Sequence, residues 1–132
     1  MRNTKETLMH SWYQEAWNKA NKDAIDKFLA PDIIAHGLAE GELRGSEGFK
    51  NFYDGFRTQF SNIHVNVDDV IKEDDIECAL CTVTAIHNET GKAVKFTGTS
   101  MGRIKDGQIV EAWNNFDFYG MYLQLGYELS IK

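Results

Sequence analysis

The sequence has a single proline, two cysteines and no long apolar run. Pro31 falls between two expected elements, and no repeat or low-complexity tract divides the chain. No stretch approaches the roughly 20 apolar residues that a membrane-spanning helix needs. The first six residues also lack the apolar core of a secretory signal. We therefore expect a cytoplasmic protein that does not enter a membrane.

The scarcity of cysteine argues against a zinc site or a redox pair. Cys78 and Cys81 form one C-x-x-C sequence in a β-like run, where a spacing of three places the two thiols on opposite faces of a sheet. No second C-x-x-C completes a zinc site. His36 with Glu40 and Glu42 fits no regular helical or strand ligand spacing. We expect no metal.

Positive charge is in deficit, since 14 Lys and Arg stand against 20 Asp and Glu and give a net charge of −6. This balance opposes the phosphate backbone, so nucleic acid is not an expected partner. The glycines between 41 and 48 lack the frame of a phosphate-binding loop, and no nucleotide site is expected. The length of 132 residues predicts one domain, 1–132, able to bury a core with a pocket inside it.

Apolar side chains recur at helical spacing in the first half of the chain. Residues 5–20 carry a wide apolar stripe, and Asn3 with Glu6 has the spacing of a capping box. A short helix is expected over 22–29, and Ser46 is expected to cap the start of a third helix. The third helix has one strongly aromatic face, formed by Phe49, Phe52, Tyr53, Phe56 and Phe60.

From residue 62 onward the apolar residues alternate, which predicts strands. The expected strands lie over 63–69, 76–88, 92–105 and 108–118, and short connections rich in turn formers join the last three into a meander. A short strand over 32–36 leads into a glycine-containing loop, and a final half-amphipathic piece over 119–125 ends at Gly126. This order predicts an α+β fold, with helices on one face of a curved antiparallel sheet.

Asp117 is the first candidate for chemistry. Strand alternation places Glu111, Trp113 and Asp117 on one side of the last strand, and Ala112 and Asn114 on the other. A carboxylate among aromatic side chains is poorly solvated, and desolvation raises a carboxyl pKa toward the range useful for proton abstraction. The alternative is that these acidic residues line the solvent face of an edge strand.

Two histidines and the aromatic stripes are further candidates. His36 follows a short apolar run at the start of the glycine loop, where it either binds a ligand oxygen or caps the loop. His87 ends an apolar strand face, either as a core histidine or as a catalytic or substrate-binding group. The aromatic stripes of the first and third helices form either the core or the wall of a cavity for a flat apolar ligand.

Several segments together resemble the SnoaL-like polyketide cyclase family. The resemblance covers nearly the whole chain in the right order. The segments are Trp12-Tyr13-x-x-x-Trp17-Asn18-x-x-Asn21, Ala30-Pro31-Asp32-x-x-x-His36-Gly37, Gly45-x-Glu47-Gly48-Phe49-x-x-Phe52-Tyr53, Phe96-Thr97-Gly98, Gly107-x-Ile109-Val110-Glu111-x-Trp113-Asn114-x-Phe116-Asp117 and Gln124-Leu125-Gly126.

This resemblance implies the cone-shaped α+β fold of the nuclear transport factor two superfamily. Three N-terminal helices pack on a curved sheet and enclose a hydrophobic cavity. Members of the family close the last ring of a polycyclic polyketide ester by aldol condensation, without metal or organic cofactor. An enolisable, flat, mostly apolar carbonyl compound is therefore the expected ligand, and an enzyme of the cyclase type is the expected function.

The resemblance also implies roles for individual residues. Asp117 matches the aspartate that removes a proton next to the ester carbonyl and later returns one. His36 and His87 match histidines that face the cavity, where they orient carbonyl or hydroxyl oxygens. The expected lining of the substrate pocket is Tyr13, Trp17, Phe52, Phe56, Met101 and Trp113.

The chain departs from the family pattern in two places. The hairpin after His87 is short, which predicts a reshaped cavity mouth, and Leu80 stands where an arginine is common. Two other functions use the same scaffold: a non-catalytic module for small-molecule binding or assembly, and an isomerase or dehydratase that uses the same acid/base residue. The exposed sheet surface of such cones commonly forms dimers, so a homo-oligomer is expected.

Overall fold

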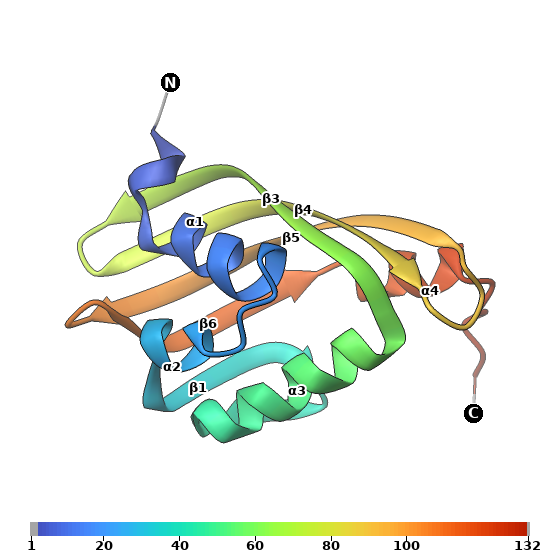
Figure 1. Cartoon of the computed structure of the whole chain (residues 1–132), viewed down its shortest axis with the longest axis horizontal. Helices are drawn as coiled ribbons and strands as arrows, with labels where there is room; N and C mark the ends of the chain where they lie inside the picture. The colour runs from blue at the N-terminus through green and yellow to red at the C-terminus, as the bar shows by residue number, and fades with distance from the viewer. Residues whose placement is uncertain (1–2, 132) are drawn as a thin grey trace.

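The computed structural model describes residues 3–131 and confirms the α+β class, with helices packed on one face of a curved sheet (Figure 1). No helix within this range is long and apolar enough to cross a membrane. The first four helical segments precede the sheet in the chain, and a longer helix follows its first two strands. They are η1 (Thr4–Glu6), α1 (Leu8–Trp12), the π-helix η2 (Tyr13–Asn18), α2 (Ala24–Phe28) and, after two strands, α3 (Gly45–Gln59).

The first helix differs from the expected single helix over 5–20, because it is broken into three pieces. The expected cap is also wrong, since the Asn3 side chain makes no capping hydrogen bond. Instead the Thr7 side chain accepts from the His10 backbone N–H at 3.2 Å. The Glu77 carboxylate, from a distant strand, accepts from the backbone N–H of Met9 at 2.9 Å. The start of α1 is therefore held by a partner 68 residues away in the sequence.

Six strands form one sheet in the order β2-β1-β6-β5-β4-β3. The pair β1 and β6 runs parallel and the other neighbours run antiparallel, so the sheet is mixed and not purely antiparallel as expected. The bounds of the strands are β1 (Leu29–Ala39), β2 (Gly41–Arg44), β3 (Phe60–Glu73), β4 (Ile76–His87), β5 (Ala93–Lys105) and β6 (Gln108–Phe116).

The strands of the meander begin and end close to the expected residues, but the segment before α3 was predicted less well. Pro31 lies inside β1 and not between elements. Part of the expected glycine loop forms the short strand β2, which pairs with β1 at one edge of the sheet. Ser46 is buried inside α3, whose N-terminal cap residue is Arg44.

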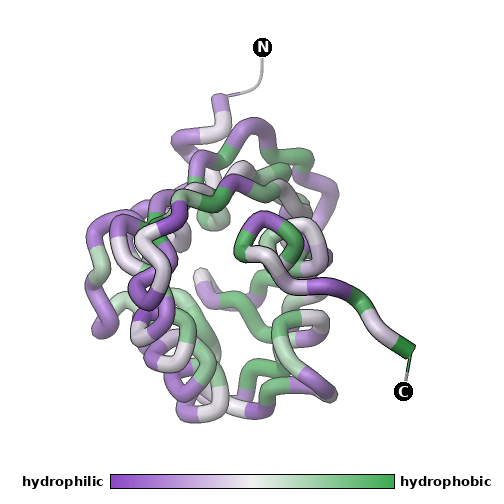
Figure 2. The backbone as a smooth tube through the Cα atoms, turned by 90° about the vertical axis from the view of Figure 1, so that its right-hand side faces the viewer, coloured by the Kyte–Doolittle hydropathy of each residue, from purple (hydrophilic) through white to green (hydrophobic). Residues whose placement is uncertain are grey.

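The last helix, α4 (Phe118–Gln124), lies at the opposite end of the sheet from the β3–β4 and β5–β6 connections (Figure 1). The Gln124 side chain accepts from the backbone N–H of Lys95 and donates to its carbonyl, both at 2.9 Å. Gly126 follows with a φ of +94°, as expected for a residue that ends a helix. The chain then leads away from the body of the protein (Figure 2), and Leu129 is 80% exposed.

A second amide side chain binds the sheet in the same way, at the edge strand β3. Asn18, the last residue of η2, accepts from the backbone N–H of Val65 at 2.6 Å. Its amide N–H donates to the Val65 carbonyl at 2.9 Å. These two bonds attach η2 to the outer edge of β3, so that Trp17 next to Asn18 lies over the concave face of the sheet.

Candidate active site

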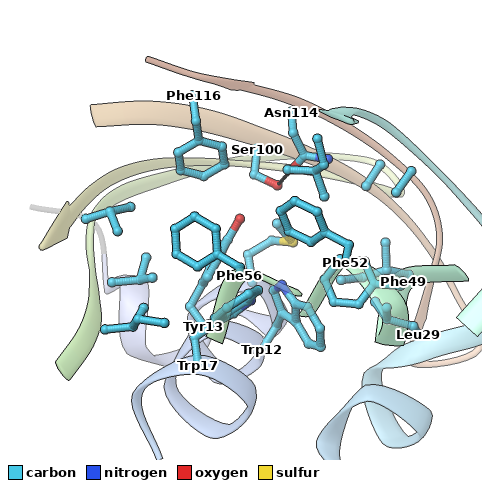
Figure 3. A pocket seen from close by; sticks show the side chains of 18 of the residues that line it. Trp12, Tyr13, Trp17, Leu29, Phe49, Phe52, Phe56, Ser100, Asn114 and Phe116 are labelled. Atoms are coloured by element: carbon cyan, nitrogen blue, oxygen red, sulfur yellow. Dashed lines mark hydrogen bonds between the residues drawn. The ribbon is translucent and has the colours of Figure 1, made fainter. Parts of the chain in front are cut away.

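An aromatic pocket lies between the concave face of the sheet and the helices (Figure 3). The space between these walls, with its opening to solvent included, is about 680 Å³. The sheet contributes mainly aliphatic residues and phenylalanines. The helices η2, α1 and α3 contribute the aromatic wall, formed by Trp12, Tyr13, Trp17, Phe49, Phe52 and Phe56.

Polar side chains are few in this pocket. Apart from the two indole N–H groups, they belong to Tyr13, Ser100 and Asn114, and no Asp, Glu, His, Lys or Arg is among the residues found to line it. Ser100 on β5 and Asn114 on β6 are directly opposite each other in the sheet, and both are buried. The pocket wall is therefore apolar except at this one place.

Hydrogen bonds fix the two strand residues. The Ser100 hydroxyl donates to the Asn114 side-chain oxygen Oδ1 at 2.7 Å (Figure 3). The Asn114 amide Nδ2 donates to the backbone carbonyl of His36 at 3.0 Å. Gly37 follows His36, and its backbone packs so closely on β6 that an added Cβ would lie 1.9 Å from the carbonyl oxygen of Asn114. The close approach of β1 and β6 thus positions the polar residues.

The protonation of Tyr13 and Cys81 follows from burial. Burial, and next the neighbouring Cys81 thiol, raises the pKa of Tyr13 well above its ordinary value, and hydrogen bonding with Ser100 offsets this only in part. Burial also raises the pKa of Cys81 to about 12. At neutral pH the phenol and the thiol therefore both keep their protons. Tyr13 can act as a hydrogen-bond donor toward the pocket.

The expected pocket residues fall into two groups. Tyr13, Trp17, Phe52 and Phe56 do line the pocket, as expected. Met101 and Trp113 do not, because they form a cross-strand pair on the opposite, convex face of the sheet.

Neither histidine is among the residues found to line the pocket. The His36 ring lies on the convex face, where it stacks on Trp113 and its Nε2 is 2.8 Å from the Glu111 carboxylate. His87 is buried at the end of β4, in contact with Phe60, and its Nδ1 is 2.9 Å from the Thr90 hydroxyl. The positions of the two rings therefore do not support the contact with a ligand that the family resemblance implies.

Asp117 is close to the pocket in the sequence but does not line it. The pocket-lining residues Phe116 and Phe118 stand on either side of it. Its own side chain is exposed, so the expected poor solvation is wrong. The carboxylate oxygen Oδ1 accepts from the Gly120 backbone N–H at 2.9 Å and caps α4. In this conformation Asp117 has a structural partner at the rim of the pocket.

Ser100 and Asn114 were not predicted as site residues, although a signal for them is present. Alternation predicts that Asn114 shares a face with Ala112, Phe116 and Phe118. An amide on a face that is otherwise apolar indicates a buried polar group that needs a partner. Ser100 supplies that partner from the neighbouring strand, and the pairing depends on a register that the sequence does not display.

Neither of the two departures from the family pattern changes the pocket wall directly. Leu80 is 47% exposed and lies on the convex face of the sheet, away from the cavity. The short hairpin after His87 lies next to the end of α4, where the Lys92 side chain approaches Gly126. Within residues 3–131 no group of three or more His, Cys, Asp or Glu is arranged to hold a metal ion.

Comparison with protein families identifies the class of this protein. The sequence profile of the SnoaL-like polyketide cyclase family matches residues 7–125, so the chain belongs to this family. The match includes every segment on which the resemblance was based, except for the terminal glycine of the last one. No curated protein sequence matches the chain significantly.

Solved structures with the same fold include proposed polyketide cyclases. IdmH from Streptomyces antibioticus, described as a proposed polyketide cyclase, is 26% identical, and the match covers 95% of this chain and 100% of that one with a TM-score of 0.81. A proposed polyketide cyclase from Bacillus cereus is 28% identical, with coverages of 90% and 78% and a TM-score of 0.80. A protein of ketosteroid isomerase-like fold from Catenulispora acidiphila is 15% identical, with coverages of 95% and 96% and a TM-score of 0.82, and shows the fold alone.

Proposed function

We propose that this protein is an enzyme of the polyketide cyclase type, which closes a carbon–carbon ring in a flat, mostly apolar carbonyl compound. The aromatic pocket with its single polar place carries the proposal. Edge-on and tilted aromatic side chains line the pocket and favour a flat ligand, and the sparse polar groups orient it. Membership of the SnoaL-like family and the likeness to proposed cyclases support the same class of reaction.

The reaction that we propose is an intramolecular aldol condensation. A base removes the proton from the carbon next to a carbonyl, and the electron pair of the broken C–H bond passes through the new C=C bond to the carbonyl oxygen. The nucleophilic carbon then bonds to a second carbonyl carbon of the same molecule, and the alkoxide formed there receives a proton from the protonated base. Atoms are conserved, and no oxidant or reductant is required.

We assign the proton transfer to Asp117. It is an ionisable residue flanked in sequence by two pocket-lining aromatic residues, Phe116 and Phe118. Its carboxylate now bonds the Gly120 N–H, so the assignment requires the side chain to rotate from the cap of α4 toward the pocket. An exposed side chain at the start of a short helix can make this change at the cost of one hydrogen bond.

The substitution Asp117→Asn tests the assignment. Asparagine caps a helix about as well as aspartate, so folding should be retained while the base is lost. With 2-acetonaphthone in D₂O, the wild-type protein should exchange the acetyl protons for deuterium, and the variant should do so about 100-fold more slowly or not at all, as measured by ¹H NMR. Full exchange by the variant would contradict a role for Asp117 in proton transfer.

A non-catalytic binding module is the second candidate function. The observation that favours it is that no Asp, Glu, His, Lys or Arg is among the described residues that line the pocket. In this case the protein binds 2-acetonaphthone, and the wild type and Asp117→Asn bind it equally well. Neither then exchanges its acetyl protons faster than the solvent does.

For the quaternary structure, we propose that two copies associate through the convex face of the sheet. Leu80 on β4 and Met101 on the neighbouring strand β5 are 47% and 36% exposed there, and Met101 is paired with Trp113 on β6. Leu80→Asp should weaken association by about 100-fold, because it places a charge at the centre of an apolar contact. Sedimentation velocity checks this, with Leu129→Asp in the exposed C-terminal segment as control. Equal association of both variants and the wild type would refute this interface.

A further inference from the structure

We propose that Tyr13, Ser100 and Asn114 form an oxygen-binding pole, and that this pole selects an uncharged carbonyl or enol group over a carboxylate. The proposal rests on the proposed function, because it concerns the ligand of the same pocket. It assigns specificity to three side chains that come together from three separate elements, η2, β5 and β6.

The backbone carbonyl of His36 determines which group donates in each hydrogen bond of this pole. The backbone carbonyl of His36 can only accept, so the group of Asn114 that faces it at 3.0 Å must be the amide Nδ2. Oδ1 of Asn114 therefore faces Ser100, and the Ser100 hydroxyl must donate its single proton to it at 2.7 Å. The Ser100 oxygen is left with lone pairs only, and so can act toward other groups as an acceptor.

Tyr13 provides the donor of the pole. Its ring lines the pocket, and its phenol lies beside Ser100 while remaining protonated. When a ligand carbonyl binds, it accepts from the Tyr13 hydroxyl in place of the Ser100 oxygen. An enol can in addition donate to the Ser100 oxygen. Because negative charge develops on this oxygen when a neighbouring carbon loses its proton, the Tyr13 hydrogen bond becomes stronger along the proposed reaction.

The lack of positively charged side chains around the pocket disfavours an anionic ligand group. No Lys, Arg or His is among the residues found to line the pocket, and the fixed direction of the bonds leaves Ser100 oxygen lone pairs near the ligand. A carboxylate would lose its hydration and gain one phenol donor and no counter-charge, which is costly in an apolar site. A ketone loses little hydration and gains the same donor.

Three ligands of similar shape test the selectivity: 2-acetonaphthone, which carries the carbonyl, 2-ethylnaphthalene, which lacks it, and 2-naphthoate, which is charged. Binding is followed by NMR through the indole N–H signals of Trp12 and Trp17, which line the pocket. The wild type should bind 2-acetonaphthone about fivefold more tightly than 2-ethylnaphthalene and at least about tenfold more tightly than 2-naphthoate.

The variant Tyr13→Phe removes the donor and keeps the ring. It should bind 2-acetonaphthone and 2-ethylnaphthalene with equal affinity and leave the affinity for 2-ethylnaphthalene unchanged. Tyr53→Phe is the matched control, since the Tyr53 hydroxyl is buried but donates to the backbone carbonyl of Ala16 at 2.7 Å outside the pocket. Its three affinities should equal those of the wild type.

Acetyl deuterium exchange, measured on the same samples, separates this proposal from the proposed function. Selective binding that Tyr13→Phe abolishes, without exchange in the wild type, supports the pole and refutes the enolising function. Exchange in the wild type without any preference among the three ligands refutes the pole and leaves the function standing. Equal affinities of Tyr13→Phe and wild type for 2-acetonaphthone, or tight binding of 2-naphthoate, also overturn the pole.

Discussion

Gly37→Ala is expected to prevent stable folding. Gly37 has a φ of +85°, and an added Cβ would lie 1.9 Å from the backbone carbonyl oxygen of Asn114. Backbone atoms cannot move aside without separating β1 from β6, the parallel pair that joins the first strand to the meander. The cost is several kcal/mol in a domain whose total stability is about 5–15 kcal/mol. Circular dichroism and urea titration should show a largely unfolded variant.

Gly91→Ala is the control for backbone conformation. Gly91 also has a positive φ, of +71°, but nothing lies within 4 Å of an added Cβ. This variant should lose only about 1–2 kcal/mol, the cost of placing a non-glycine residue in the left-handed region. If Gly37→Ala were no less stable than Gly91→Ala, the close approach of β1 to β6 could not be essential to the fold.

Glu77→Ala should lower the stability by about 3 kcal/mol, equivalent to roughly 10 °C in the midpoint of thermal unfolding. Glu77 is 4% exposed, and its carboxylate accepts from the backbone N–H groups of Met9 at 2.9 Å and Leu8 at 3.3 Å. Alanine leaves both donors without this acceptor at the buried start of α1, and the ion pair with Lys72 at 3.8 Å is also lost. Differential scanning calorimetry measures the change.

Glu73→Ala is the matched control, since Glu73 is an exposed glutamate at the end of the adjacent strand β3. Its midpoint should lie within about 2 °C of the wild type, because surface substitutions of this kind change the stability by at most about 0.5 kcal/mol. An equal loss in both variants would show that Glu77 contributes through general surface charge. The cap of α1 would then have no special role.

The pocket face shows which part of the site the sequence could predict. Alternation correctly separates Asn114 from Trp113, because neighbouring residues of a strand point to opposite faces. It does not say which face is concave, and both faces of β6 carry aromatic residues. The acidic residues considered as catalytic candidates are predicted to lie on the face with Glu111 and Trp113, and that face is convex. The sign of the curvature comes from packing of the helices, which is a property of the whole fold.

Long-range partners explain the other differences. The helical spacing of the first segment is correct, and the buried residues Met9, Trp12 and Ala16 belong to the expected stripe. Its capping depends on Glu77, which lies on β4 and has no local signal. The parallel pairing of β1 with β6 likewise joins segments about 80 residues apart, which spacing along the chain cannot show. The α+β class was predictable because it needs only the order of the elements.

Two residues of the segments that resemble the family, Asn18 and Gln124, have a consequence for the behaviour of this protein at high concentration. The Asn18 side chain bonds both the backbone N–H and the carbonyl of Val65, on the open edge of β3. The Gln124 side chain does the same for Lys95, where β5 extends beyond β6. Unpaired strand edges recruit further strands from other molecules. At these two points the amide side chains occupy the positions that an incoming strand would need, so the exposed ladder cannot continue there into a fibril.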